Sequence, residues 1–72
     1  MLNELDKLEQ QADVLMHHLE VNNKKIYQQK LADHNWDIRR IEANQRIINE
    51  LRYLAELINE LQEYIEREQL VK

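Results

Sequence analysis

The three histidines are the residues of this sequence best suited to bind a metal ion or to transfer a proton near neutral pH. His17 and His18 are adjacent, so on a helix their side chains point about 100° apart and cannot both bind one metal ion within a single chain. Asp13 lies one turn before His17, but His34 is distant, and the Glu-x-x-His motif of helical-bundle metal sites does not occur. We therefore predict no metal site and no cofactor, and we interpret the histidines as solvated surface residues.

Carboxylates crowd the C-terminal third of the chain, where neighbours three or four residues apart could supply an acid and a base. Such pairs do acid–base chemistry only in a shaped, partly dry cleft, and a helix face this rich in charge is solvated. We therefore predict that the protein is not an enzyme and that it has no catalytic residues. The carboxylates are Glu56, Glu60, Glu63, Glu66 and Glu68.

Charge changes sign along the chain. Residues 1–20 carry a net charge of −4, residues 24–46 carry +3 and residues 47–72 carry −3, and the whole chain carries −4. This acidic balance disfavours nucleic acid or an anionic membrane as the main partner, because both reward a basic surface. The basic residues in the middle remain candidates for binding a macromolecule: Lys24, Lys25, Lys30, Arg39, Arg40 and Arg46.

The composition indicates an all-α protein that is stabilised by assembly. The chain has 72 residues, 33% of them charged, and contains no Gly, Pro, Phe or Cys, as is typical of long helices and coiled coils. A core of this size contributes only a few kcal/mol, so oligomerisation is the remaining source of stability in the absence of disulfides or metals. We expect residues 1–72 to form one helical domain.

Apolar residues recur at alternating spacings of three and four positions in two stretches, residues 5–26 and residues 47–65. This spacing places them along one face of a coiled-coil helix. Further apolar residues beside the second run, such as Ile48 and Leu57, widen that face to the width found in bundles of three or four helices. We predict that the following residues form an oligomer interface: Leu5, Leu8, Ala12, Leu15, Leu19, Ile26, Ile47, Leu51, Leu54, Ile58, Leu61 and Ile65.

Two asparagines interrupt these apolar runs. Asn22 and Asn44 occupy core positions of the heptad repeats, where a polar residue can fix the register and the number of helices at some cost in stability. They are therefore candidates for setting the register. The alternative interpretation is that each lies near the rim of a bundle and is simply solvated.

The two runs are out of phase with each other, and two architectures explain the mismatch. One is a continuous 72-residue helix in an oligomeric coiled coil, with a four-residue stutter near residues 27–46. The other is an antiparallel hairpin with helices over about 3–32 and 36–71 and a turn at 33–36, where residues of poor helix propensity cluster. We favour the hairpin because its two helices have matched lengths, and we expect pairs of hairpins to form a four-helix bundle.

Particular residues mark the ends of the hairpin's helices. Asn3 is the predicted N-cap of the first helix, and Asp33 or Asn35 is the predicted cap of the second. Folding back near residues 34–35 would set Leu5 opposite Ile65. No glycine is present to end the first helix, which is the main argument against the turn.

These features predict a self-assembling coiled-coil module, natural or engineered, that holds subunits together and presents its outer surface to another protein. The expected partners are further copies of the chain, as a dimer or tetramer, and another helical protein. The alternative is a small regulatory hairpin dimer that binds RNA or another macromolecule through its basic middle. No apolar run is long enough to span a membrane, so we expect a soluble protein and favour an intracellular location.

Overall fold

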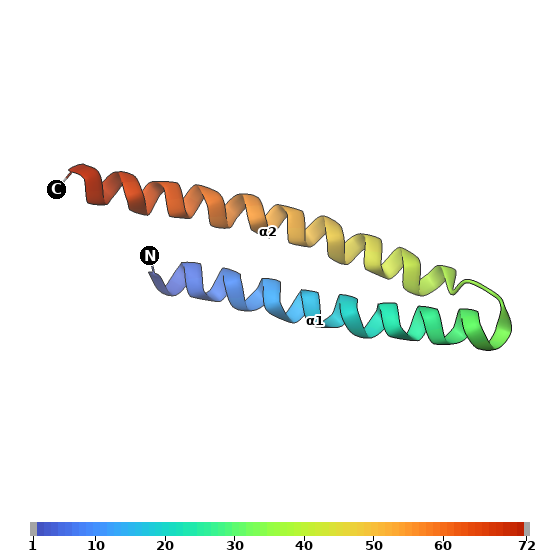
Figure 1. Ribbon diagram of the computed structural model, residues 1–72. Coiled ribbons are helices and arrows are strands. Elements are labelled where there is room, and N and C mark those ends of the chain that lie inside the picture. The colour runs from blue at the N-terminus through green and yellow to red at the C-terminus, as the bar shows by residue number, and fades with distance from the viewer. Residues whose placement is uncertain (1, 72) are drawn as a thin grey trace.

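The computed structural model describes the backbone of residues 2–71 and the side chains of residues 3–69. Two helices, α1 (Leu2–Asp33) and α2 (Ile38–Val71), pack side by side as an antiparallel hairpin (Figure 1). The hairpin measures 61 × 15 × 13 Å. The predictions of an all-α fold and of a helical hairpin are confirmed, and the alternative of one continuous helix is wrong.

Both helices follow from the same local features of the sequence. Their interiors lack Gly and Pro, and each carries a heptad run that supplies a face to bury. The predicted helix ends differ from the observed ones by one or two residues. Because α1 begins at Leu2, Asn3 lies inside the helix, and its prediction as the N-cap is wrong.

His34 ends α1 without a glycine. Its φ angle is 60°, in the left-handed region that usually favours glycine, and its N–H donates to the Lys30 carbonyl oxygen at 2.9 Å. The Lys30 ammonium in turn donates to the His34 carbonyl oxygen at 2.9 Å. These two hydrogen bonds satisfy backbone groups at the helix end and compensate for the unfavourable backbone angle.

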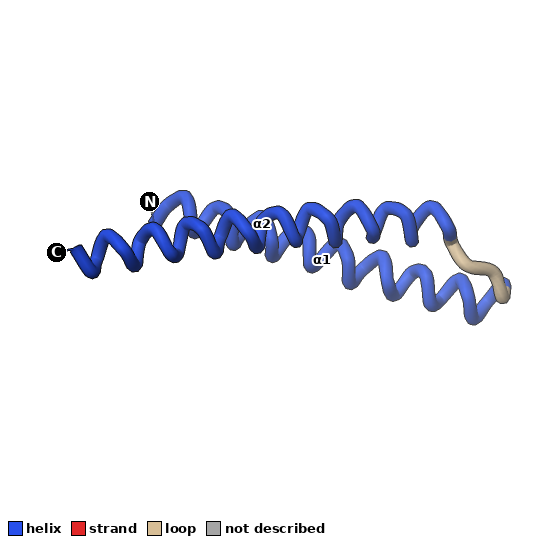
Figure 2. The backbone as a smooth tube through the Cα atoms, turned by 90° about the horizontal axis from the view of Figure 1, so that it is seen from above, coloured by secondary structure: helices blue, strands red, loops and turns tan. Residues whose placement is uncertain are grey.

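Asp37 is the N-cap of α2, whereas the sequence analysis predicted Asp33 or Asn35. Its carboxylate accepts a hydrogen bond from the Arg40 backbone N–H at 3.1 Å, and its carbonyl oxygen accepts one from the Ile41 N–H at 3.0 Å. These are the bonds of an N-cap, where an acidic side chain also complements the helix dipole. The connection therefore spans residues 34–37 (Figure 2).

The register of the two helices differs from the predicted pairing. A hydrogen bond joins Asn22 to Asn44, and counting outward from it at equal rise places Leu5 level with Leu61, one turn before Ile65. The shift arises because the connection folds back along α1 and brings the Trp36 ring beside Lys30. As a result, α2 extends beyond the N-terminal end of α1 (Figure 1).

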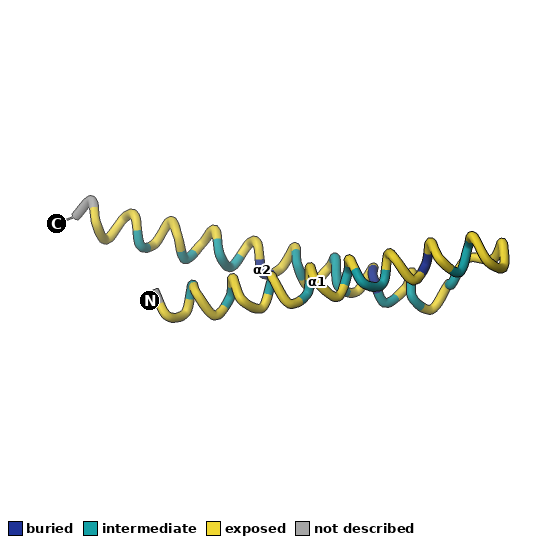
Figure 3. The backbone as a smooth tube through the Cα atoms, turned by 60° about the horizontal axis from the view of Figure 1, so that its bottom comes forward, coloured by how far each residue is buried: buried dark blue, intermediate teal, exposed yellow. Residues whose placement is uncertain are grey.

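The space between the helices holds a thin core. Among the described side chains, Ile26 is 6% exposed and Leu54 is 7% exposed, and no large side chain is completely buried. Most of the other residues on the facing surfaces are only half-buried, and such residues recur along both helices (Figure 3). The single chain therefore covers only part of its apolar surface.

Candidate protein interface

The residues predicted to form the oligomer interface lie along the surfaces where α1 and α2 face each other. Ile26 and Leu54 are buried, and the other ten are half-buried. Part of each of these ten side chains therefore remains open to contact beyond the hairpin itself. We call these twelve predicted interface residues the seam.

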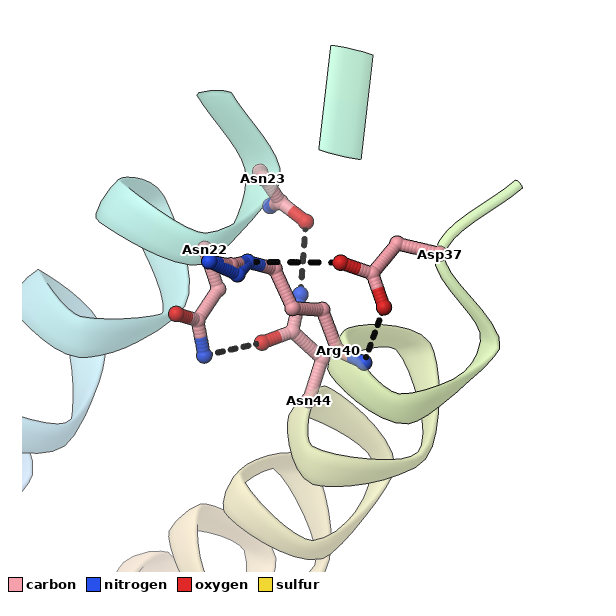
Figure 4. A network of polar contacts seen from close by, with 5 residues as sticks. All are labelled: Asn22, Asn23, Asp37, Arg40 and Asn44. Carbon is pink, nitrogen blue, oxygen red and sulfur yellow. Dashed lines mark hydrogen bonds and ion pairs between the residues drawn. The ribbon is translucent and has the colours of Figure 1, made fainter. Parts of the chain in front are cut away.

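An asparagine cluster crosses the seam. Asn44 is only 6% exposed, and its side-chain oxygen accepts a hydrogen bond from Asn22 Nδ2 at 3.0 Å. Its side-chain nitrogen donates to Asn23 Oδ1 at 2.8 Å (Figure 4). Both ends of the buried amide are thus paired, so its burial leaves neither polar atom unsatisfied.

Asn23 was not singled out from the sequence, although it completes this cluster. It lies next to the core position of Asn22, at the edge of α1 that faces α2. Three neutral amides offer hydrogen bonds but no nucleophile and no charge. The cluster is therefore suited to fixing how the helices align and not to catalysis.

The basic residues gather at the end of the hairpin that carries the connection, which we call the turn end. Arg40 and Lys30 are half-buried: Arg40 Nε lies 3.5 Å from the Asp37 carboxylate, and the Lys30 ammonium lies 4.9 Å from the centre of the Trp36 ring. The other four candidate cations are exposed. They are Lys24, Lys25, Arg39 and Arg46.

A shallow hollow lies on one side of the seam near the turn end. Its walls include Asn23, Tyr27, Trp36, Ile41 and Ile48, and its floor includes Ile26 and Asn44. Tyr27 and Trp36 are 65% and 51% exposed.

The surface beside the hollow continues along both helices. Met16 lies two helical turns from Asn23 along the same side of α1, and Ala55 lies two turns from Ile48 along α2. We call Met16, Asn23, Tyr27, Ile41, Ile48 and Ala55 the isoleucine flank.

A second groove lies on the opposite side of the seam, nearer the middle of the hairpin. Its walls include Val14 and Tyr53, which are 55% and 62% exposed, together with the charged residues Lys7 and Glu50. We call Lys7, Val14, Glu50 and Tyr53 the tyrosine flank. The two hollows thus differ in charge as well as in position, because no charged residue among those described lines the first, whereas Lys7 and Glu50 line the second.

The histidines and the glutamate-rich end lie on the surface of the hairpin. His17 and His18 are exposed, with ring centroids 6.5 Å apart. Among the described residues, no three His, Cys, Asp or Glu side chains come close enough together to hold a metal ion. The glutamates from Glu56 to Glu68 are all exposed.

Neither described helix contains a stretch that is both long enough and apolar enough to cross a membrane. Most of the exposed large apolar side chains lie on the two flanks and at the turn end, and Tyr64, toward the open end, is 43% exposed. Leu31 and Ile38 at the turn end are 79% and 59% exposed.

Comparison of the chain with protein-family models, with curated proteins and with solved structures finds no match.

Proposed function

We propose that this protein is a self-assembling helical module whose hairpins pair into a four-helix bundle and whose outer surface binds another protein. The observation that carries the proposal is the incomplete burial of the seam. A heptad surface that is apolar at every core position except the asparagines is only partly covered by the partner helix of the same chain. A second hairpin packed on one side of the seam would cover more of it.

The energetics support pairing. Complete burial of a Leu or Ile side chain contributes roughly 1.5–3 kcal/mol. Ile26 and Leu54 are buried, whereas the other ten seam side chains are only half-buried, so a lone hairpin gains less than its seam could contribute. Covering the half-buried seam on association supplies the missing stabilisation.

Urea unfolding followed by circular dichroism at several protein concentrations tests this proposal. If folding and assembly are coupled, the midpoint rises with concentration, because dilution favours the unfolded monomer. A helical signal whose midpoint is the same over a thousandfold range of concentration would contradict the proposal. Loss of helix at low concentration would support it.

Exposed cations beside an aromatic side chain favour a second candidate function, the binding of RNA. Arg39, Arg46 and Tyr53 recur every seven residues, so they lie along one line of α2 on the side of the tyrosine flank. Cations along a line attract phosphates, and an exposed tyrosine can stack on a base. The acidic opposite end of the hairpin and the pairing of Arg40 with Asp37 weaken this candidate.

Fluorescence titration of a labelled RNA stem-loop at physiological salt separates the two functions. We expect weak association that disappears as salt is raised, because the chain carries a net charge of −4. Submicromolar binding that is lost on replacing Lys24, Lys25, Arg39 and Arg46 with Gln would establish the second candidate instead. The matched control is replacement of Arg52 and Arg67, which lie outside the basic middle.

A further inference from the structure

We infer that the second hairpin packs on the isoleucine flank and runs in the opposite direction, so that the turn end of each hairpin lies beside the open end of the other. This inference rests on the proposed self-assembly and specifies its surface and orientation. Two features carry it. One is the difference in charge between the two flanks, and the other is the difference in charge between the two ends of the hairpin.

The flanks differ in what their burial would cost. The described residues that line the hollow of the isoleucine flank are apolar, aromatic or neutral amides. The groove of the tyrosine flank contains Lys7 and Glu50. Burying a charge requires removing its water, whereas a neutral apolar surface gains free energy on burial. The isoleucine flank is therefore the better surface for a second copy.

The isoleucine flank also extends beyond the hollow, over about 21 Å of α2 from Ile41 to Ala55. Ile41, Ile48 and Ala55 recur every seven residues on α2, and Met16 and Asn23 do so on α1. Ile48 is half-buried and Ile41 is 39% exposed, so both retain surface to bury. Such a continuous stripe suits another long helical pair rather than a small ligand.

The two ends of the hairpin differ in charge, and this sets the direction. Residues 24–46, at the turn end, carry a net charge of +3, whereas residues 1–20 and 47–72 together carry −7 at the open end. Pairing in opposite directions lays each basic end beside an acidic end. Pairing in the same direction would stack like charges, which is unfavourable although partly screened by salt.

A two-fold axis across the middle of the interface produces this arrangement. It packs α1 of one hairpin against α1 of the other, and α2 against α2, with every neighbouring helix antiparallel. The axis passes near the midpoint of the hairpin, which falls close to Met16 when residues are counted from the Asn22–Asn44 bond. The two copies of Met16 therefore lie close together across the interface.

A pair of matched substitutions tests which flank is buried. Met16 and Val14 are 51% and 55% exposed, but they lie on opposite flanks because they are two residues apart on one helix. Met16→Lys should raise the dimer dissociation constant by at least about tenfold, because each dimer would bury two unpaired ammonium groups. Val14→Lys should leave the dissociation constant unchanged within about twofold.

The direction is tested by a distance between spin labels attached at Asn35→Cys, in the exposed connection. Since the hairpin is 61 Å long, oppositely directed hairpins place the two labels on the order of 50 Å apart. Hairpins that point the same way would place them within about 25 Å, a few helix diameters. The chain has no native cysteine, so the labelling is specific.

The outcomes separate this inference from the proposed function. A dimer that dissociates on Val14→Lys but not on Met16→Lys, or that gives the short label distance, would overturn the inference while leaving self-assembly in place. A wild-type protein that stays monomeric would overturn both. If Met16→Lys also unfolds the chain, oxidation of Met16→Cys provides a second readout, in which rapid formation of a disulfide-linked dimer supports the inference and its absence contradicts it.

Discussion

Asn44 is the residue that we propose sets the alignment of the two helices. It is buried, and both atoms of its amide are bonded to the other helix, to Asn22 and to Asn23. Any other register would separate these partners and leave a buried amide unpaired, which costs more than the bonds themselves contribute. We therefore expect the cluster to favour one alignment among those that an apolar seam alone would tolerate.

Replacing Asn44 with Ala should lower the free energy of unfolding by about 1–3 kcal/mol, because Asn22 and Asn23 lose their shared partner. Urea unfolding measures the loss. Gln28→Ala is the control: Gln28 carries the same side-chain amide but is exposed, and the change should stay within about 0.5 kcal/mol. Equal effects of the two substitutions would contradict a special role for the buried cluster.

At the scale of the elements, the sequence revealed more about the helices than about their junction. The alternating spacings from Leu5 to Ile26 and from Ile47 to Ile65 correctly place the faces that the hairpin partly buries. The turn was predicted within one or two residues, but its cap was not. Asp33, Asn35 and Asp37 are all suitable caps by type, and only the three-dimensional path of the chain selects Asp37.

The register was missed for a related physical reason. Folding back at 34–35 assumes a symmetric turn, whereas the left-handed His34 and the contact between Lys30 and Trp36 direct the connection back along α1. A left-handed residue other than glycine carries little signal in sequence, because its cost is offset by local hydrogen bonds. The contribution of Asn23 was missed because heptad positions identify core residues and not their polar neighbours.

His34→Gly should raise the free energy of unfolding by up to about 1 kcal/mol, because glycine adopts a positive φ angle without the steric cost paid by histidine. Thermal and urea unfolding at one protein concentration measure the change. Asn35→Gly is the matched control, since no positive φ angle occurs at Asn35, and it should be neutral or slightly destabilising. A clear loss of stability in His34→Gly would mean that the imidazole itself holds the turn.

The connection should also tolerate lengthening. Insertion of three glycines between His34 and Asn35 should change the free energy of unfolding by no more than about 1 kcal/mol, because the cost of closing a loop grows slowly with its length. The same insertion would disrupt a continuous helix by several kcal/mol. Urea unfolding combined with the distance between labels at residues 5 and 61 distinguishes the two, and a long label separation would contradict the hairpin.

At the scale of the whole molecule, the hairpin is long, thin and charged at both ends. Its 61 Å length against a width of 15 Å gives much surface for little core. In the proposed dimer a second hairpin covers the isoleucine flank, and the segregation of charge between the turn end and the open end would favour one direction of pairing. Residues 1–20 and 47–72 would then lie beside the basic middle of the other copy.

Leu54→Asp should unfold and dissociate the protein together. Leu54 is 7% exposed, and burying a carboxylate there costs several kcal/mol, more than a lone hairpin can lose. Tyr53→Asp is the control. Tyr53 is 62% exposed on the tyrosine flank, so this substitution should change the free energy of unfolding by less than about 0.5 kcal/mol. A Leu54→Asp chain that stays helical and monomeric would show that folding does not depend on assembly.

Sedimentation equilibrium of the unmodified chain tests directly whether two hairpins form the folded unit. We expect a reversible equilibrium whose upper limit is twice the mass of the chain, with the helical circular dichroism signal falling as the protein dissociates. This would show that two hairpins form the folded unit. A mass of one chain at every concentration, accompanied by a full helical signal, would contradict the account.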